Sequence, residues 1–278
     1  MKKSYIINWL ILGILSIIWG SSFILMKKSL LDFSYLDVAF FRLIIAFFVL
    51  SPFLVKSLKN MRISHIIPII IVSIIGTVIP AVLFAYTQTH LDSSTAGMLN
   101  SLTPIFTLII GVVLFEKKWT KDSVIGIIIG LVGSYILLLP SKLNIINTQY
   151  SLMVIIATIC YALSINTIKD KLQSLKPLDI AVISSLFSFI IPVIYIFNSG
   201  ISITISKINT NVVSFFYLII LGALCTSFAI VLFNYLIKRT SALFGSSTTY
   251  LIPAFAVLWG IVDHETIENH ETIGLIII

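Results

Sequence analysis

Charged residues are scarce in this sequence. Only 10% of its 278 residues are Asp, Glu, Lys or Arg, whereas 58% are hydrophobic, and the mean hydropathy is +1.10. Soluble domains carry about 25% charged residues. Roughly 20 consecutive apolar residues span the hydrocarbon core of a bilayer, and such stretches recur from one end of the chain to the other. The composition therefore excludes a soluble domain and predicts a polytopic membrane protein.

Cysteine is almost missing, and nucleotide-binding motifs are missing altogether. Cys160 and Cys225 stand singly in apolar surroundings, without the spacing of a metal or redox pair, so we interpret both as packing residues. The chain has no G-x-x-x-x-G-K-[ST] loop, which argues against ATP hydrolysis. We therefore expect a protein without enzymatic activity, without a metal and without a cofactor.

Carboxylates are missing from the deep parts of the apolar segments. Glu116 and Glu265 lie at the ends of their segments. A buried carboxylate is the usual proton relay in membrane pumps. Its absence weakens a proton-coupled mechanism without excluding it.

Polar residues divide the chain into nine full apolar segments and the start of a tenth. These segments are 6–26, 36–55, 65–88, 93–115, 122–139, 150–168, 179–197, 211–237, 241–262 and 272 onward. The last is too short to cross a bilayer, so we expect the C-terminal helix to be incomplete in this sequence. The first follows MKKSY and imitates a signal peptide, but its length and the missing cleavage site favour a true span.

The basic residues predict the orientation of these segments. Thirteen of the 18 Lys and Arg residues fall on the side of the N-terminus, four fall on the other side, and Arg42 lies within a segment. Because cytoplasmic loops are enriched in Lys and Arg, we expect the N-terminus and the loops at 56–62 and 117–121 in the cytoplasm, with the protein in the inner (cytoplasmic) membrane. The net charge of +7 is dispersed over five inner segments, so it predicts no nucleic-acid partner.

The two halves of the chain resemble each other. Residues 77–116 align without a gap with residues 226–265 at an offset of 149, and an offset of 142 aligns the residues upstream. The matched pairs include Asp37 and Asp179, Tyr86 and Tyr235, Pro104 and Pro253, and Glu116 and Glu265. Each half holds five segments, so the second half must enter the membrane from the opposite side. We predict an all-α membrane protein of ten transmembrane helices, built as two inverted five-helix repeats over 1–140 and 141–278, which favours a carrier over an inert scaffold.

Five sequence patterns carry a family likeness. In chain order they are WGSSF, FRLIIAF, SLTPIFTLIIGVVLFE, GIIIGLVG and YLIPAFAVLWGIVDHE. The sequence resembles, over essentially its whole length, the drug/metabolite transporter superfamily, specifically its ten-span EamA-type members. The resemblance implies a monomer-sized helical bundle with a central cavity that exports or imports small metabolites, often amino acids. Departures from the pattern are Phe115 in place of a glycine, Tyr161-Ala162 in place of a tryptophan-glycine pair, and Ser184 where the first half has Arg42.

The WGSSF stretch lies in the outer third of the first segment. Trp19 and Ser22 share one face of a helix, and an indole N–H in an apolar segment needs a partner or a wet cavity. Glycine and serine also permit close helix packing. Cavity lining and packing are both open for this stretch, and Tyr161 occupies the position that matches Trp19 in the second half.

Arg42 is the strongest candidate for a functional residue. A guanidinium at the centre of the bilayer costs about 2.5–3.5 kcal/mol, so its side chain should face protein or water. One interpretation is an ion pair with Asp37 or Asp32 at the outer end of its helix. The other is bidentate binding of a substrate carboxylate, which the planar guanidinium permits.

Segments 93–115 and 241–262 each carry small hydroxyl residues ahead of a proline. Pro104 and Pro253 free a backbone carbonyl one turn earlier, which a neighbouring hydroxyl or a substrate can satisfy. Asn100 and Thr249 occupy matched positions four residues before these prolines. Broken helices at equivalent places in two halves point to a substrate site, although a kink that serves only packing is an alternative. We predict a substrate site formed by Trp19, Ser22, Arg42, Asn100, Tyr161, Thr249 and Tyr250.

The sequence thus predicts a secondary transporter that moves small metabolites, such as amino-acid-like solutes, by alternating access and in the direction of export. Its expected partners are the small-molecule substrate and the lipid bilayer. A non-transporting membrane scaffold and a membrane enzyme on a lipid-like substrate are the alternatives. The enzyme would need histidines or acids clustered at one interface, whereas His65, His90, His264 and His270 are scattered over different loops. A scaffold would not need polar residues at matched positions of two halves.

Overall fold

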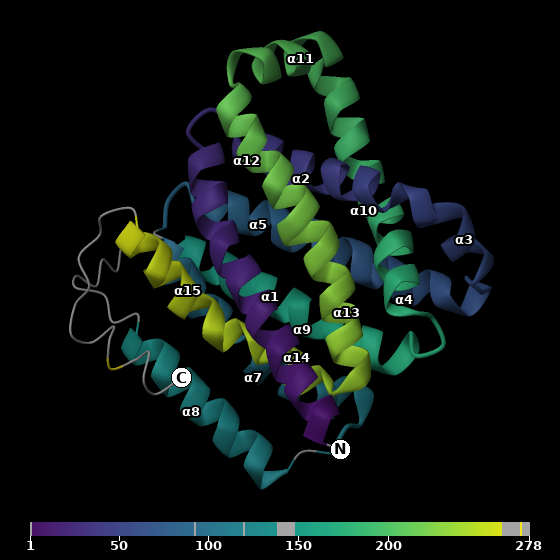
Figure 1. The fold of residues 1–278 in the computed structure, drawn as a ribbon, viewed down its shortest axis with the longest axis vertical. Helices are drawn as coiled ribbons and strands as arrows, with labels where there is room; N and C mark the ends of the chain where they lie inside the picture. The colour runs from purple at the N-terminus through teal and green to yellow at the C-terminus, as the bar shows by residue number, and fades with distance from the viewer. Residues whose placement is uncertain (1, 92, 119, 138–147, 263–272, 274–278) are drawn as a thin grey trace.

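The computed structural model describes residues 2–91, 93–118, 120–137, 148–262 and 273 (Figure 1). Within these residues the chain forms helices and turns and contains no strand, as expected for an all-α protein. The elements before residue 140 are α1 (Lys2–Ser29), α2 (Tyr35–Leu50), η1 (Ser51–Phe53), α3 (Leu54–Lys59), η2 (Ile63–His65), α4 (Ile66–Ile70), η3 (Ile71–Val78), α5 (Ile79–Thr87), α6 (Ser93–Asn100), α7 (Thr103–Phe115) and α8 (Lys121–Leu137). Those after it are α9 (Thr148–Lys171), α10 (Pro177–Ser199), α11 (Ile201–Thr210), α12 (Val212–Gly222), η5 (Ala223–Phe228), α13 (Ala229–Arg239), α14 (Ala242–Ser246) and α15 (Thr248–Val262).

Six of the described helical runs are long and apolar enough to cross a membrane. They are Tyr5–Ser29, Tyr35–Lys59, Ile63–Thr87, Gln149–Lys171, Pro177–Ser199 and Val212–Arg239. The protein is therefore a multi-pass membrane protein. Of the other predicted segments, 122–139 forms the 17-residue α8, two are divided into shorter helices, and the one from 272 lies almost wholly outside the described residues. Ten spans remain a prediction.

The two divided segments are the ones predicted to be broken, but the breaks differ. In the first half, the helix stops after α6 and restarts as α7 with Pro104 in its first turn, where a missing N–H costs nothing. In the second half, the break falls at Ser247, and Pro253 lies inside α15. Side-chain hydroxyls explain the earlier break, because Ser246 and Ser247 each donate 2.8 Å hydrogen bonds to carbonyls of the preceding turn. Pro104 and Pro253 are both predicted to break their helices, but Pro253 lies inside α15 and the break in its segment falls earlier, at Ser247.

The helices of the two halves interleave around one core. Helix α1 packs against α12, α13 and α15, α9 packs against α5, α7 and η3, and α2 packs against α10 and α12. The glycine of the WGSSF stretch explains one of these approaches, because a Cβ on Gly20 would lie 2.5 Å from Cβ of Phe255 in α15. A small residue is required there for close helix packing.

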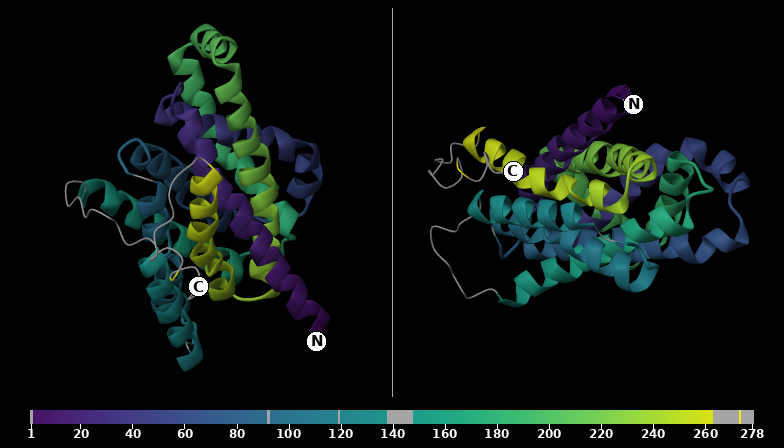
Figure 2. Two further views of the ribbon diagram at one scale, coloured as in Figure 1. Left: turned by 60° about the vertical axis from the view of Figure 1, so that its left-hand side comes forward. Right: turned by 90° about the horizontal axis from the view of Figure 1, so that it is seen from below.

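The N-terminal turns of α1 project from the rest of the bundle in both views of Figure 2. Apolar side chains on this part of α1, such as Tyr5, Ile6 and Leu10, are exposed, as expected for a surface that faces lipid. Helix α11 lies at the far end of the molecule from the N-terminus, where it joins α10 to α12 (Figure 1). The bundle therefore has two distinct ends.

Candidate functional site

One cavity of about 150 Å³ lies among the helices, and residues from both halves line it. Six of the seven residues predicted for the substrate site are on its wall: Trp19, Ser22, Arg42, Asn100, Tyr161 and Thr249. They come from α1, α2, α6, α9 and α15, which the amino-acid sequence separates widely. The remaining wall includes Phe84, Phe233, Thr77, Thr226, Gly76 and Ser164.

Arg42 is the only charged residue among the described residues that line the cavity. Its Nε donates a hydrogen bond of 3.1 Å to Oγ1 of Thr226 in η5. Within the described part of the chain, its two terminal nitrogens have no hydrogen-bond or ion-pair partner. These nitrogens carry four N–H donors, so the guanidinium presents an unsatisfied positive edge at the cavity.

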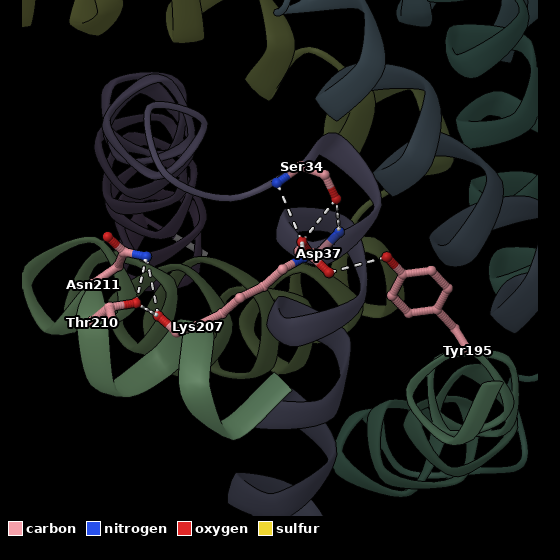
Figure 3. A network of polar contacts seen from close by, with 6 residues as sticks. All are labelled: Ser34, Asp37, Tyr195, Lys207, Thr210 and Asn211. Carbon is pink, nitrogen blue, oxygen red and sulfur yellow. Dashed lines mark hydrogen bonds and ion pairs between the residues drawn. The ribbon is translucent and has the colours of Figure 1, made fainter. Parts of the chain in front are cut away.

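The interpretation of Arg42 as the partner of Asp37 or Asp32 is wrong. Asp37 instead accepts hydrogen bonds from Tyr195 Oη and Lys207 Nζ, each at 3.0 Å, and from the Ser34 hydroxyl (Figure 3). Its position in the first turn of α2, beside the cap residue Ser34, keeps the carboxylate at the helix N-terminus. Asp32 accepts a hydrogen bond from the Ser214 hydroxyl. Arg42 lies about one and a half turns beyond Asp37 in α2, and its side chain contacts the cavity and Thr226 instead.

Aromatic rings form much of the cavity wall around Arg42. The Tyr161 ring stacks on Phe84 with centroids 5.9 Å apart, and Trp19 meets Phe233 edge to face at 4.9 Å. The indole Nε1 of Trp19 donates to the carbonyl of Cys225 at 3.1 Å, so the partner that this N–H needs is a backbone carbonyl of the second half. The Tyr161 hydroxyl has no hydrogen-bond partner within the described residues. Arg42 and Tyr161 therefore both line the cavity with polar groups that have no hydrogen-bond partner among the described residues.

Two π-helical segments, η3 and η5, lie at matched positions of the two halves and both reach the cavity. In η3 the Thr77 hydroxyl donates to the carbonyl of Val72 at 3.0 Å, and in η5 the Thr226 hydroxyl donates to the carbonyl of Leu221 at 2.9 Å. Both bonds reach back five residues. π-Helical turns are rare and occur frequently at functional sites, and here each one turns a threonine toward the cavity.

Asn100 and Thr249 lie on the cavity wall at the C-terminal end of α6 and the N-terminal end of α15. The Thr103 hydroxyl donates to the Asn100 carbonyl at 2.7 Å, and Thr249 donates to the carbonyl of Ser246 at 2.9 Å. The Thr103 hydroxyl thus satisfies the carbonyl that Pro104 frees, as predicted for that stretch. The Thr249 hydroxyl satisfies the Ser246 carbonyl, which is not the one that Pro253 frees. Ser22 behaves similarly, since it donates to the carbonyl of Trp19 at 2.6 Å.

Tyr250 does not line the cavity. Its ring lies against Gly130 of α8, and its hydroxyl donates to the carbonyl of Ile127 at 3.0 Å. The reason is helical geometry, because neighbouring residues of a helix point about 100° apart, so Thr249 and Tyr250 cannot face the same space. Tyr250 therefore fastens α15 to α8.

Sequence reasoning missed Thr226, Gly76 and Ser164. Thr226 and Thr77 are the first identical pair in the aligned halves, and that signal could have drawn attention to them. Ser164 carried a similar signal, because the offset of 142 aligns it with Ser22, whereas Gly76 left none. The described residues contain no group of three or more His, Cys, Asp or Glu side chains that could hold a metal ion.

The fold and the cavity can now be compared with known proteins. The family model of the EamA-like transporter family matches residues 7–139 and again residues 148–278. The chain belongs to the EamA-like transporter family. This confirms the resemblance that the five sequence patterns indicated, and it makes the chain a membrane transporter.

Relatives of this EamA-like protein are also named as transporters. It is 25% identical over 267 residues to the uncharacterized inner membrane transporter YedA of Escherichia coli, covering 94% of this chain and 84% of YedA. It is 25% identical over 180 residues to an uncharacterized transporter of Archaeoglobus fulgidus, which covers 65% of this chain and 62% of that relative. One solved crystal structure superposes with a TM-score of 0.70 at 12% identity, over 97% of this chain and 93% of the other, which supports the fold alone.

Proposed function

We propose that this EamA-like transporter is a secondary carrier that exports small organic solutes bearing a carboxylate, such as amino-acid-like metabolites, by alternating access. One observation carries the proposal. Arg42 and Tyr161 line a single cavity, and the terminal nitrogens of Arg42 and the hydroxyl of Tyr161 have no hydrogen-bond partner among the described residues. A carboxylate in the cavity would bind the guanidinium through two parallel charge-assisted hydrogen bonds.

The dimensions and the wall of the cavity support a small, partly apolar solute. An engineered apolar cavity of 150 Å³ holds benzene, so a space of about 150 Å³ suits a metabolite of similar size. Phe84, Phe233 and Trp19 would contact the apolar body of the solute, and Arg42 would bind its charge. This division of apolar wall and a few polar groups is typical of ligand sites.

Contacts between the halves at both ends of the bundle support alternating access. At one end, Asp37 of α2 joins Tyr195 of α10 and Lys207 of α11 (Figure 3). At the end of α3, the matched Asp179 of α10 accepts hydrogen bonds of 2.8 and 2.9 Å from Ser57 and Asn60. We propose that these two inverted halves rock about the cavity and that each movement breaks the polar contacts at one end and keeps those at the other.

Counterflow in proteoliposomes tests the proposed function. Vesicles preloaded with an unlabelled panel of amino acids, other small carboxylates and their neutral amides are diluted into the labelled solute. We expect accumulation of at least one labelled carboxylate and none of its amide, because only the carboxylate can accept two charge-assisted hydrogen bonds from the terminal nitrogens of Arg42. Protein-free vesicles are the control. Transport of neutral solutes alone would contradict the proposal.

We also propose that the N-terminus is cytoplasmic, which the distribution of Lys and Arg supports. Lys59 and Lys118 are exposed and would then face the cytoplasm, whereas the exposed Thr210 of α11 would face outward. Each is replaced by cysteine, after the native Cys160 and Cys225 have been shown not to react. In intact cells, we expect an impermeant maleimide to label the Thr210→Cys protein and not the other two. The reverse pattern would overturn the orientation.

A further inference from the structure

The side-chain hydroxyl of Thr226 contacts the guanidinium of Arg42. Its single hydroxyl proton is donated to the carbonyl of Leu221 at 2.9 Å, so toward Nε of Arg42, at 3.1 Å, the oxygen can only accept. The residue is 4% exposed. The π-helical segment η5 places this hydroxyl, because the bond to Leu221 reaches back five residues instead of four.

The Arg42 guanidinium can hold a carboxylate in two ways, through Nε and one terminal nitrogen or through the two terminal nitrogens. The bond to Thr226 uses Nε and blocks the first way. We infer that Thr226 is a positioning residue, which fixes the Arg42 guanidinium so that its two terminal nitrogens form the carboxylate-binding edge of the cavity. This inference rests on the proposed function, because it assigns the part of that site that orients the anion-binding group.

The first half of the chain provides a matched comparison. Thr77 of η3 donates the same five-residue bond, to Val72 at 3.0 Å, and also lines the cavity. The residue that corresponds to Arg42, however, is Ser184, which donates to the carbonyl of Ala181 at 3.1 Å. A small second cavity of about 10 Å³ is lined by Thr77, Ser184 and also Thr226. The two threonines thus have equal roles in their own helices, and Thr226 alone of the pair holds an arginine.

The experiment compares Thr226→Val, Thr226→Ser and Thr77→Val in the full-length protein in detergent. The chain has only three arginines, Arg42, Arg62 and Arg239, so ¹⁵N labelling of arginine gives a spectrum in which Arg42→Lys identifies the Arg42 signals. Benzoate is the carboxylate probe, because its ring suits the aromatic wall, and benzamide is its neutral control. The measured quantities are the hydrogen-exchange rate of the Arg42 Nε–H and the apparent Kd for benzoate.

In the wild-type protein we expect a protected Nε–H and terminal nitrogens that shift with benzoate but not with benzamide. Thr226→Val should expose the Nε–H to exchange and weaken benzoate binding by roughly 2- to 12-fold, the effect of one hydrogen bond. Thr226→Ser should restore both. Thr77→Val loses the same bond within its helix but does not remove a partner of Arg42, so it should leave the Arg42 Nε–H protected.

Two outcomes would overturn the inference in distinguishable ways. If Thr226→Val leaves Nε–H protection and benzoate affinity unchanged while benzoate still shifts Arg42, Thr226 does not position the guanidinium, and the proposed function stands. If benzoate fails to shift Arg42 in the wild-type protein, the anion-binding role of Arg42 fails, and the positioning role fails with it. An equal loss of Arg42 Nε–H protection in Thr77→Val and Thr226→Val would assign the effect to helix structure and would also overturn the inference.

Discussion

Replacing Arg42 with alanine should weaken transport of a carboxylate solute by roughly 10- to 100-fold in apparent affinity. Hydrogen bonds to a charged group contribute about 1.5–3 kcal/mol, and each 1.4 kcal/mol is a factor of ten. Arg42→Lys should lose about tenfold, because an ammonium keeps the charge but lacks the planar pair of donors. Counterflow KM values for the carboxylate that the wild-type protein accumulates would measure both effects.

The control for this prediction measures whether the Arg42 variants still fold. Arg42 has no ion-pair partner among the described residues, so its removal leaves no opposite charge unpaired. Size-exclusion elution and thermal unfolding in detergent should therefore be close to those of the wild type. Arg62→Lys, in an exposed loop, is the matched control substitution. Normal transport of the carboxylate by both Arg42 variants would end the proposal that Arg42 binds the solute.

Gly76→Ala should destabilise the transporter by about 1–3 kcal/mol, the usual effect of overpacking, and should abolish most transport. A Cβ on Gly76 would lie 2.1 Å from Oγ and 2.3 Å from Cβ of Ser164, so η3 and α9 would have to separate at the cavity. The Ser164 Cα is 3.7 Å from the same point, which is an ordinary contact. Combining Gly76→Ala with Ser164→Gly should therefore restore much of the lost stability and transport.

A double-mutant cycle of thermal unfolding and counterflow measures this coupling between the two halves. Residues in direct contact show interaction energies of about 0.5–3 kcal/mol. Gly126→Ala is the control, because a Cβ at Gly126 meets nothing within 4 Å, and alanine is the better helix former. Additive effects of Gly76→Ala and Ser164→Gly would show that the contact does not hold the halves together.

Arg42 was identified from the sequence as a functional residue, but its contact in the folded protein was not. Its charge within an apolar segment marked it as functional, and the structure places it at the cavity. Its partner could not be predicted, because the nearest acids in the sequence, Asp37 and Asp32, are bound elsewhere and the true partner is Thr226. A helix shows from its period which of its residues share a face, but not which other helix meets that face.

The sequence by itself determined the membrane character, the helical class, the family and six residues of the cavity wall. The lengths of the apolar segments, the basic loops and the matched polar positions can be read from the sequence, because the bilayer constrains each segment separately. Tertiary structure alone decided that Tyr250 faces α8, that Gly76 meets Ser164, and that Thr226 accepts the Nε–H of Arg42. These contacts join helices that are distant in the chain, so they depend on how whole helices pack against one another, and no single segment carries that information.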